Sequence, residues 1–216
     1  MCGRYLIEDE AYADLLLILN ELNKGNFAPG DFAPGEVFPT HVAPVIGNEG
    51  AAIAKWGFPH WKNSSVIINA RAETALDKSM FRKALRERRC VVPSSGFYEW
   101  SRSGSSEGGR KSKGKPKDKY LCRQPGEHML YMAGFSNTFH DALGNKYDAF
   151  TILTTVANES ISSIHDRMPV ILAADEFDQW TQDDGFMEYV LHRPGPELSL
   201  TLTSDKPLEY YESILD

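Results

Sequence analysis

The sequence has few of the features that mark secreted, membrane-bound or metal-binding proteins. Its three cysteines, Cys2, Cys90 and Cys122, are an odd number and form no CxxC pair, so neither a disulfide framework nor a zinc site is indicated. The first residues are polar where a signal peptide needs an apolar run, and no segment is long and apolar enough for a membrane span. We therefore expect a cytoplasmic protein without membrane contact, metal or cofactor.

A surplus of positive charge is also missing. The formal net charge is -7, which argues against a protein that coats nucleic acid by bulk attraction. Residues 101–119 are the exception, with seven basic and two acidic residues, and we interpret them as a mobile basic loop between two strands. An anionic ligand must therefore be held by a local cluster of arginines.

Apolar residues at helical spacing predict a helix over residues 8–23, with a buried stripe that includes Leu15, Leu19 and Leu22. Residues 26–44 repeat FAPG and are rich in proline and glycine, which predicts a shaped loop. Further helical patterns cover 79–89, 174–181 and 185–192.

Short β-like runs dominate the rest of the chain. They are AAIAKW, VIINAR, CVVP, GFYEW, MLYMAGFS and YDAFTILTT. Many short strands with a few helices predict an α+β fold around a bent or barrel-like, mainly antiparallel sheet. At 216 residues, a single domain over 1–216 is the expectation, and we expect a monomer.

Three short segments carry residues suited to chemistry. In VIINARAE (66–73), a single strand would place Ile67, Asn69 and Arg71 on one face. An amide beside a guanidinium can orient a polar substrate and hold a phosphate or carboxylate. The alternative is a strand end that faces solvent.

In SGFYEW (95–100), Glu99 lies among aromatic residues. A carboxyl that loses hydration there has a raised pKa and can exchange protons near neutral pH. A surface glutamate whose stem covers a ring is the alternative.

In SIHDRMPVIL (163–172), Pro169 favours an extended Met168, and an extended chain would let His165 and Arg167 project together. Histidine is the side chain best placed to exchange protons at neutral pH. The other histidines have no metal-ligand spacing and receive no role: His41, His60, His128, His140 and His192.

The motifs MCGRY, APG (33–35), WGFPHW, INARAET, GFYEW and HDRMP occur in this order over about residues 2–172. Together they resemble the SOS response-associated peptidase family, also called SRAP domains. The resemblance implies a mixed α/β domain that binds single-stranded DNA and becomes covalently attached to abasic sites. By the same resemblance Cys2 is the attaching residue, and Asn69, Glu99 and His165 assist it. The implied DNA contacts are Arg4, Arg71 and Arg167 near the backbone, with Pro34 and Trp61 in a base-stacking wedge.

Cysteine at position 2 suits that reaction if Met1 is removed. An α-amine has a pKa of about 7.7–8.0, so part of it is neutral at pH 7 and can condense with the aldehyde of an opened abasic sugar. The thiol of the same residue then reaches the imine carbon and closes a five-membered thiazolidine. Ring closure within one residue benefits from effective molarities of ~10⁵ M or more.

Two other functions remain open on the sequence. One is a peptidase in which Cys2 is an N-terminal nucleophile, aided by the same Glu99 and His165. The other is a non-catalytic reader of modified or single-stranded DNA. Trp61 has an alternative of its own, since a core aromatic fits WGFPHW as well; we expect Trp56 inside and Trp61 at the rim.

Overall fold

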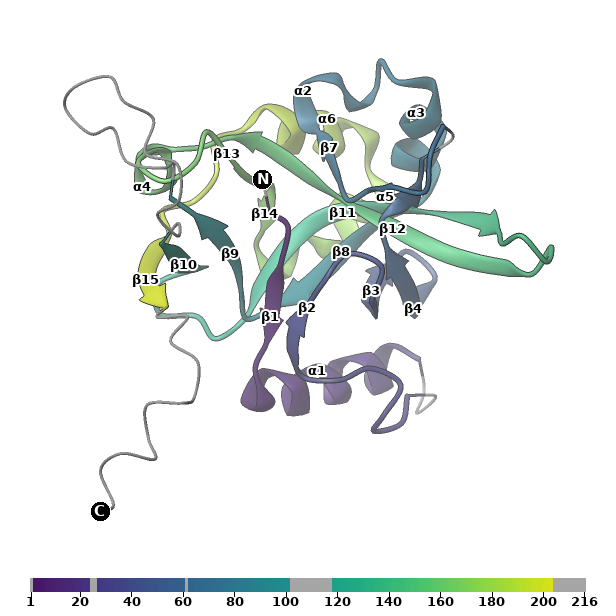
Figure 1. Ribbon diagram of the computed structural model, residues 1–216, viewed down its shortest axis with the longest axis horizontal. Coiled ribbons are helices and arrows are strands. Elements are labelled where there is room, and N and C mark those ends of the chain that lie inside the picture. The colour runs from purple at the N-terminus through teal and green to yellow at the C-terminus, as the bar shows by residue number, and fades with distance from the viewer. Residues whose placement is uncertain (1, 24–26, 61, 102–117, 204–216) are drawn as a thin grey trace.

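The computed structural model describes residues 2–23, 27–60, 62–101 and 118–203 (Figure 1). The fold is α+β with mainly antiparallel strands, which confirms the predicted class. The helices are α1 (Asp9–Leu22), α2 (Ala72–Ala75), α3 (Ser79–Glu87), α4 (Glu159–Ser162), α5 (Phe177–Gln182) and α6 (Asp184–His192), with a 3₁₀ turn η1 (Ala174–Glu176). The strands are β1 (Tyr5–Ile7), β2 (Gly35–Val37), β3 (Val42–Gly47), β4 (Gly50–Trp56), β5 (Phe58–Pro59), β6 (Val66–Ile67), β7 (Asn69–Arg71), β8 (Arg89–Ser94), β9 (Gly96–Trp100), β10 (Lys119–Arg123), β11 (Leu130–His140), β12 (Lys146–Val156), β13 (Arg167–Pro169), β14 (Ile171–Leu172) and β15 (Ser199–Thr203).

The larger sheet closes on itself. Its strands run in the order β12–β4–β3–β8–β11, and β11 pairs again with β12 through Gly134–His140, so the ring is complete. Only the short β12–β4 contact within this ring is parallel. Three short strands are attached to it, β7 and β13 on β12 and β14 on β11. Closure confirms the barrel-like expectation and removes the exposed edges of an open sheet.

A second sheet, in the order β15–β10–β9–β1–β2, carries the N-terminal segment (Figure 1). Tyr5 of β1 is opposite both Val37 and Phe97, and Phe97 is opposite Cys122. Directly opposed residues point to the same face of a sheet, and all four of these are buried. This row therefore forms the inner face of the sheet and packs into the core, on the same face as Glu99.

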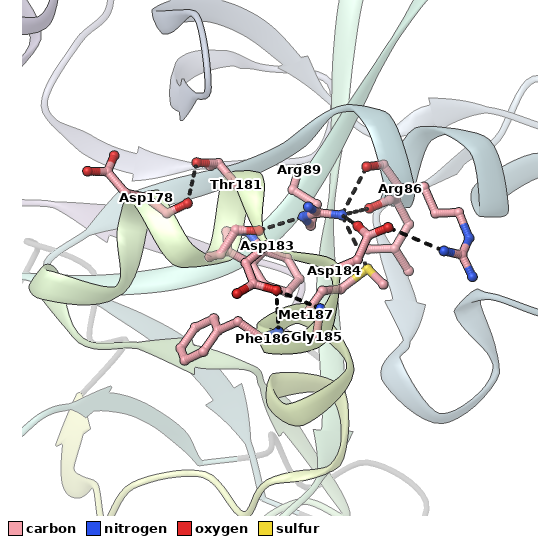
Figure 2. Close-up of polar contacts among 11 residues, drawn as sticks. Arg86, Arg89, Asp178, Thr181, Asp183, Asp184, Gly185, Phe186 and Met187 are labelled. Atoms are coloured by element: carbon pink, nitrogen blue, oxygen red, sulfur yellow. Dashed lines mark hydrogen bonds and ion pairs between the residues drawn. The ribbon is translucent and has the colours of Figure 1, made fainter.

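A buried arginine joins α5 and α6 to the barrel (Figure 2). The Arg89 side chain is 2% exposed, and its Nη1 donates to Asp184 Oδ1 at 2.8 Å and to the Arg86 carbonyl at 2.9 Å. Its Nε donates to the Trp180 carbonyl, while the Trp180 indole donates to the Cys90 carbonyl at 3.0 Å. The charge is thus satisfied by one carboxylate and several carbonyls, as a buried guanidinium requires.

The predicted single strand over 66–71 is wrong, because the chain is divided at Ile68. Residues before it pair with β5 in a small hairpin, whereas Asn69–Arg71 pair in parallel with β12. The Ile68 carbonyl accepts hydrogen bonds from the Trp56 indole at 3.1 Å and from the Ile152 amide at 3.1 Å. Ile67 therefore belongs to a different sheet from Asn69 and Arg71, although the last two do share a face.

Three other expectations need adjustment. Leu22 is 46% exposed, so the buried stripe of α1 ends at Leu19. The segment 26–44 is not wholly loop, since it contains β2 and enters β3. Lys119, taken as part of the basic loop, is a buried residue of β10; of that loop, residues 102–117 lie outside the described part of the chain.

The remaining helical predictions are confirmed with shifts of one to two residues at their ends, and Trp56 is buried as expected. No helix in the described ranges is long and apolar enough to cross a membrane.

Candidate active site around Cys2

Cys2 lies at the entrance to β1 and is fully buried. Its carbonyl oxygen accepts a hydrogen bond of 2.8 Å from Asn69 Nδ2. Its thiol points toward the next part of the chain, with Sγ 3.8 Å from the Arg4 carbonyl oxygen. A side chain 67 positions away in sequence thus fixes the backbone of the residue predicted to react.

Asn69 is held by the barrel. It begins β7, opposite Ile152 of β12, and the following Ala70 is buried against the core. While Nδ2 is engaged by Cys2, the buried Oδ1 has no hydrogen-bond partner within the described residues. An unsatisfied buried acceptor costs free energy, so this oxygen is suited to a donor from a substrate or from a processed N-terminus.

Glu99 is 2% exposed, which excludes the surface alternative. Burial raises the pKa of the Cys2 thiol well above its ordinary value, and the nearby negative charge of Glu99 raises it further. The pKa of Cys122 is raised by the same two causes, in the same order. Glu99 is therefore close enough to act electrostatically on both thiols, and both thiols are protonated at neutral pH.

His165 lies between α4 and β13 and its side chain is 23% exposed. The chain bends at Asp166 and becomes extended only from Arg167, so the expected extended run through His165 is wrong. Instead, the backbone N–H of Arg167 donates to His165 Nδ1 at 3.0 Å. Strands β13 and β7 flank opposite edges of β12 near Thr154, so the chain after His165 runs close to the strand that carries Asn69.

Arg4 lies on the outer face of the second sheet. Its guanidinium is 4.3 Å from the ring centre of Phe38 and 5.2 Å from that of Trp100. Nη1 donates to Glu36 Oε2 at 2.9 Å, and the other oxygen of Glu36 accepts from Lys119 Nζ at 2.6 Å. Three charges in this cluster sum to +1, so a positive centre remains close to the chain that leads to Cys2.

The other two predicted backbone contacts lie beside β12. Arg71 is exposed at the end of β7, opposite Thr154. Arg167 is largely buried and forms a two-pronged ion pair with Glu73, at 2.7 Å and 2.8 Å. Its Nη2 also donates to the Thr154 carbonyl.

Of the predicted stacking residues, Pro34 is exposed in the turn before β2, and Trp61 lies outside the described residues. Among the ranges that the structure describes, no group of three or more histidine, cysteine or acidic side chains could hold a metal ion.

The structure adds Glu73, Glu36 and Lys119, which the sequence interpretation did not assign. Glu73 lies two residues after Arg71 of the NAR motif, but nothing in the sequence pairs it with a residue 94 positions later. Lys119 ends the basic segment 101–119, and the sequence does not distinguish this one buried lysine from the other lysines of the segment.

The chain thus combines a closed, mainly antiparallel barrel with a buried Cys2 whose carbonyl oxygen is bound by the Asn69 amide. The family model described as SOS response associated peptidase (SRAP) matches residues 1–202. The chain belongs to this family.

Its relatives include the abasic site processing protein YoqW of Bacillus subtilis (strain 168), which is 34% identical over 188 residues that cover 83% of this chain and 80% of that protein. The abasic site processing protein YedK of Escherichia coli (strain K12) is 26% identical over 200 residues, covering 85% and 81%. The abasic site processing protein HMCES of Xenopus tropicalis is 30% identical over 142 residues, covering 58% of this chain and 42% of that protein.

Solved structures share the fold. A crystal structure of a protein from Bordetella bronchiseptica has a TM-score of 0.71 at 22% identity and covers 94% of this chain and 100% of that one. Another, from Bacteroides thetaiotaomicron, has a TM-score of 0.67 at 23% identity and covers 94% and 85%.

Proposed function

We propose that this protein processes abasic sites in single-stranded DNA by forming a thiazolidine between Cys2, after removal of Met1, and the aldehyde of the opened sugar. The names of the relatives support abasic sites as the substrate class. The reaction assigned to Cys2 draws on the geometry around that residue.

The observation that carries the proposal is the contact between Asn69 and Cys2. The amide nitrogen holds the Cys2 carbonyl at 2.8 Å, and the amide oxygen is a buried acceptor without a described partner. A free α-amine on Cys2 would supply the missing donor. Asn69 would then form hydrogen bonds with both the carbonyl and the α-amine of Cys2 and orient the lone pair of the amine toward the aldehyde.

The order of steps follows from the raised pKa of the thiol. Because the Cys2 sulfur is protonated at neutral pH, the amine attacks first. The carbinolamine loses one water to give the imine. Sulfur then attacks the imine carbon, its proton passes to the imine nitrogen directly or through a neighbouring base, and the ring closes with no further loss of atoms.

Glu99 is buried and raises the pKa of the Cys2 thiol, which supports a role in these proton transfers at Cys2. We assign it to opening of the sugar hemiacetal and to loss of water from the carbinolamine. His165, on the neighbouring segment, is assigned to proton transfer at the sugar oxygen or at the imine.

DNA would be held by the local cations rather than by the net charge. Arg4, Arg71 and Arg167 are the phosphate contacts in this proposal, with Pro34 and Trp61 against the bases. Each phosphate contact to a single strand steepens the dependence of log K on log salt by about 0.7. Stacking would be tolerant of sequence, because every base has a π-face.

A cysteine peptidase is the weaker alternative. Such an enzyme works through a thiolate, whereas burial and Glu99 both disfavour the thiolate of Cys2. A non-catalytic reader of DNA would need neither a nucleophile at position 2 nor the Asn69 contact.

The test is incubation with single-stranded DNA that contains one abasic site, followed by denaturing electrophoresis. Wild-type protein should give a slower band that survives denaturation. Cys2→Ala keeps the amine but lacks the thiol, so it should give a stable band only after borohydride reduction of the imine. Cys90→Ala, which removes another buried cysteine, should crosslink like wild type. An undiminished stable band with Cys2→Ala would refute the proposal, and the absence of any adduct from wild type would favour the reader.

A further inference from the structure

We propose that Glu73 is a positioning residue for this reaction, holding Arg167 and through it the imidazole of His165 in place. The inference rests on the proposed function for its kinetic consequence, but its structural part can be measured independently.

The contact between Glu73 and Arg167 is well formed. Both carboxylate oxygens accept, at 2.7 Å from Nη1 and 2.8 Å from Nη2, and the Arg167 side chain is only 12% exposed. Burial alone would raise the pKa of Glu73, but the hydrogen bonds and charge of Arg167 outweigh it and hold that pKa below its usual value. This is the bidentate geometry in which arginine fixes direction as well as charge.

The ion pair joins two segments that each carry a site residue. Glu73 belongs to α2, which continues directly from β7 and Asn69. Arg167 begins β13, two residues after His165, and also donates to the Thr154 carbonyl of β12. The Glu73–Arg167 pair therefore bridges the two edges of β12 at the end where the site lies.

Arg167 also acts on His165 through its backbone. Its N–H donates to His165 Nδ1 at 3.0 Å, so in the neutral ring Nδ1 is the acceptor and the proton is on Nε2. Asp166 Oδ1 lies 3.1 Å from the same Nδ1, a contact that becomes favourable only when Nδ1 carries a proton. Movement of Arg167 would disturb the first arrangement and with it the direction of Nε2.

A different role for Glu73 would be competition with DNA, in which the carboxylate shields Arg167 from phosphate. That role predicts that loss of the carboxylate strengthens DNA binding. The slight exposure of Arg167 and its additional bond to a backbone carbonyl favour the positioning role, because both terminal nitrogens of the guanidinium already bind the protein and only its positive charge is left to act on DNA.

The positioning role and the competition role can be distinguished by measuring the crosslinking rate and the affinity for DNA separately. For Glu73→Gln we expect a crosslinking rate at saturating DNA about tenfold lower, with the Kd for undamaged single-stranded DNA changed less than about twofold. Arg167→Lys keeps the positive charge but cannot form the bidentate contact with Glu73, so its crosslinking rate should fall to a similar degree. If Glu73 acts through Arg167, the double variant should be no slower than either single variant. Glu87→Gln, which removes an exposed charge from a surface pair with Lys83, is the matched control and should behave as wild type.

The second readout is the nitrogen spectrum of the His165 ring, assigned with His165→Gln. The neutral ring should show the Nε2–H tautomer in wild type and in Glu87→Gln, and a mixture of tautomers in Glu73→Gln. An unchanged tautomer signal, multiplicative rate losses in the double variant, or tighter DNA binding without loss of rate would overturn the inference. A wild-type protein that forms no crosslink would refute the proposed function alone, since the tautomer signal still decides the role of Glu73.

Discussion

Asn69 shows how one side chain can serve two purposes at the site. Its nitrogen fixes the Cys2 carbonyl, and its oxygen is left as a buried acceptor. A carboxylate at the same position could accept from an amine but could not donate to a carbonyl. The amide therefore suits a role in which both a donor and an acceptor are required within one residue of the reacting atoms.

Substitution of Asn69 tests this role. Asn69→Asp replaces the donor to Cys2 with a repelling oxygen, so we expect a crosslinking rate about 10–100-fold lower, the equivalent of losing a buried hydrogen bond of ~1–3 kcal/mol. The rate at saturating DNA measures it. Asn48→Asp, the same change at an exposed turn, should leave the rate unaltered. Equal rates for Asn69→Asp and wild type would remove Asn69 from the mechanism.

At the scale of elements, the barrel places the site by bringing short strands to β12. The patterns of AAIAKW, CVVP and YDAFTILTT predict their strands, because alternation and β-branching are local properties. The break at Ile68 was not predictable from these patterns. It arises where the Ile68 carbonyl accepts hydrogen bonds from the Trp56 indole and from the Ile152 amide. The bend at Asp166 has a similar origin, because the His165 side chain accepts a hydrogen bond from the backbone N–H of Arg167, two residues later. An alternating sequence pattern does not reveal such a bond.

Arg89 offers a test of how the C-terminal helices are attached. Arg89→Met keeps much of the volume but leaves the Trp180 and Arg86 carbonyls without their donor, so we expect a loss of about 2–4 kcal/mol in the free energy of unfolding. Denaturant unfolding measures it. Asp184→Asn removes the partner whose side chain is 57% exposed and should cost ~1 kcal/mol or less. A larger loss for Asp184→Asn than for Arg89→Met would show that the ion pair, rather than the carbonyl contacts, fixes these helices.

At the scale of the whole molecule, this acidic protein pairs several of its arginines with carboxylates. Glu36, Glu73 and Glu176 pair with Arg4, Arg167 and Arg193 respectively. Each pair joins residues distant in sequence, which explains why the sequence motifs indicated the cysteine, the amide, the carboxyl and the histidine but not their supports. Motifs report the residue types that a reaction needs, whereas charge pairing across the fold depends on topology.

These pairs predict how stability depends on pH. The pKa of Glu176 is lowered by its hydrogen bonds from Arg193, and the pKa values of Glu36 and Glu73 are lowered because their cationic partners outweigh burial. A carboxyl with a lowered folded-state pKa contributes stability above the unfolded value, here near 4.5, and loses it as the pH falls further. The thermal midpoint should therefore fall steeply below about pH 4.5, and less steeply in Glu73→Gln. A midpoint that stays level through this range would contradict the pairing.

The central claim concerns the nitrogen and the sulfur of a single residue, and mass spectrometry of the adduct tests it most directly. After crosslinking and treatment with borohydride, digestion of the DNA with a nuclease and of the protein with trypsin should release residues 2–4 without Met1, carrying the sugar remnant with loss of one water and no added hydrogen. An adduct on a peptide that still begins with Met1, on a lysine, or heavier by two hydrogens after reduction would contradict the thiazolidine.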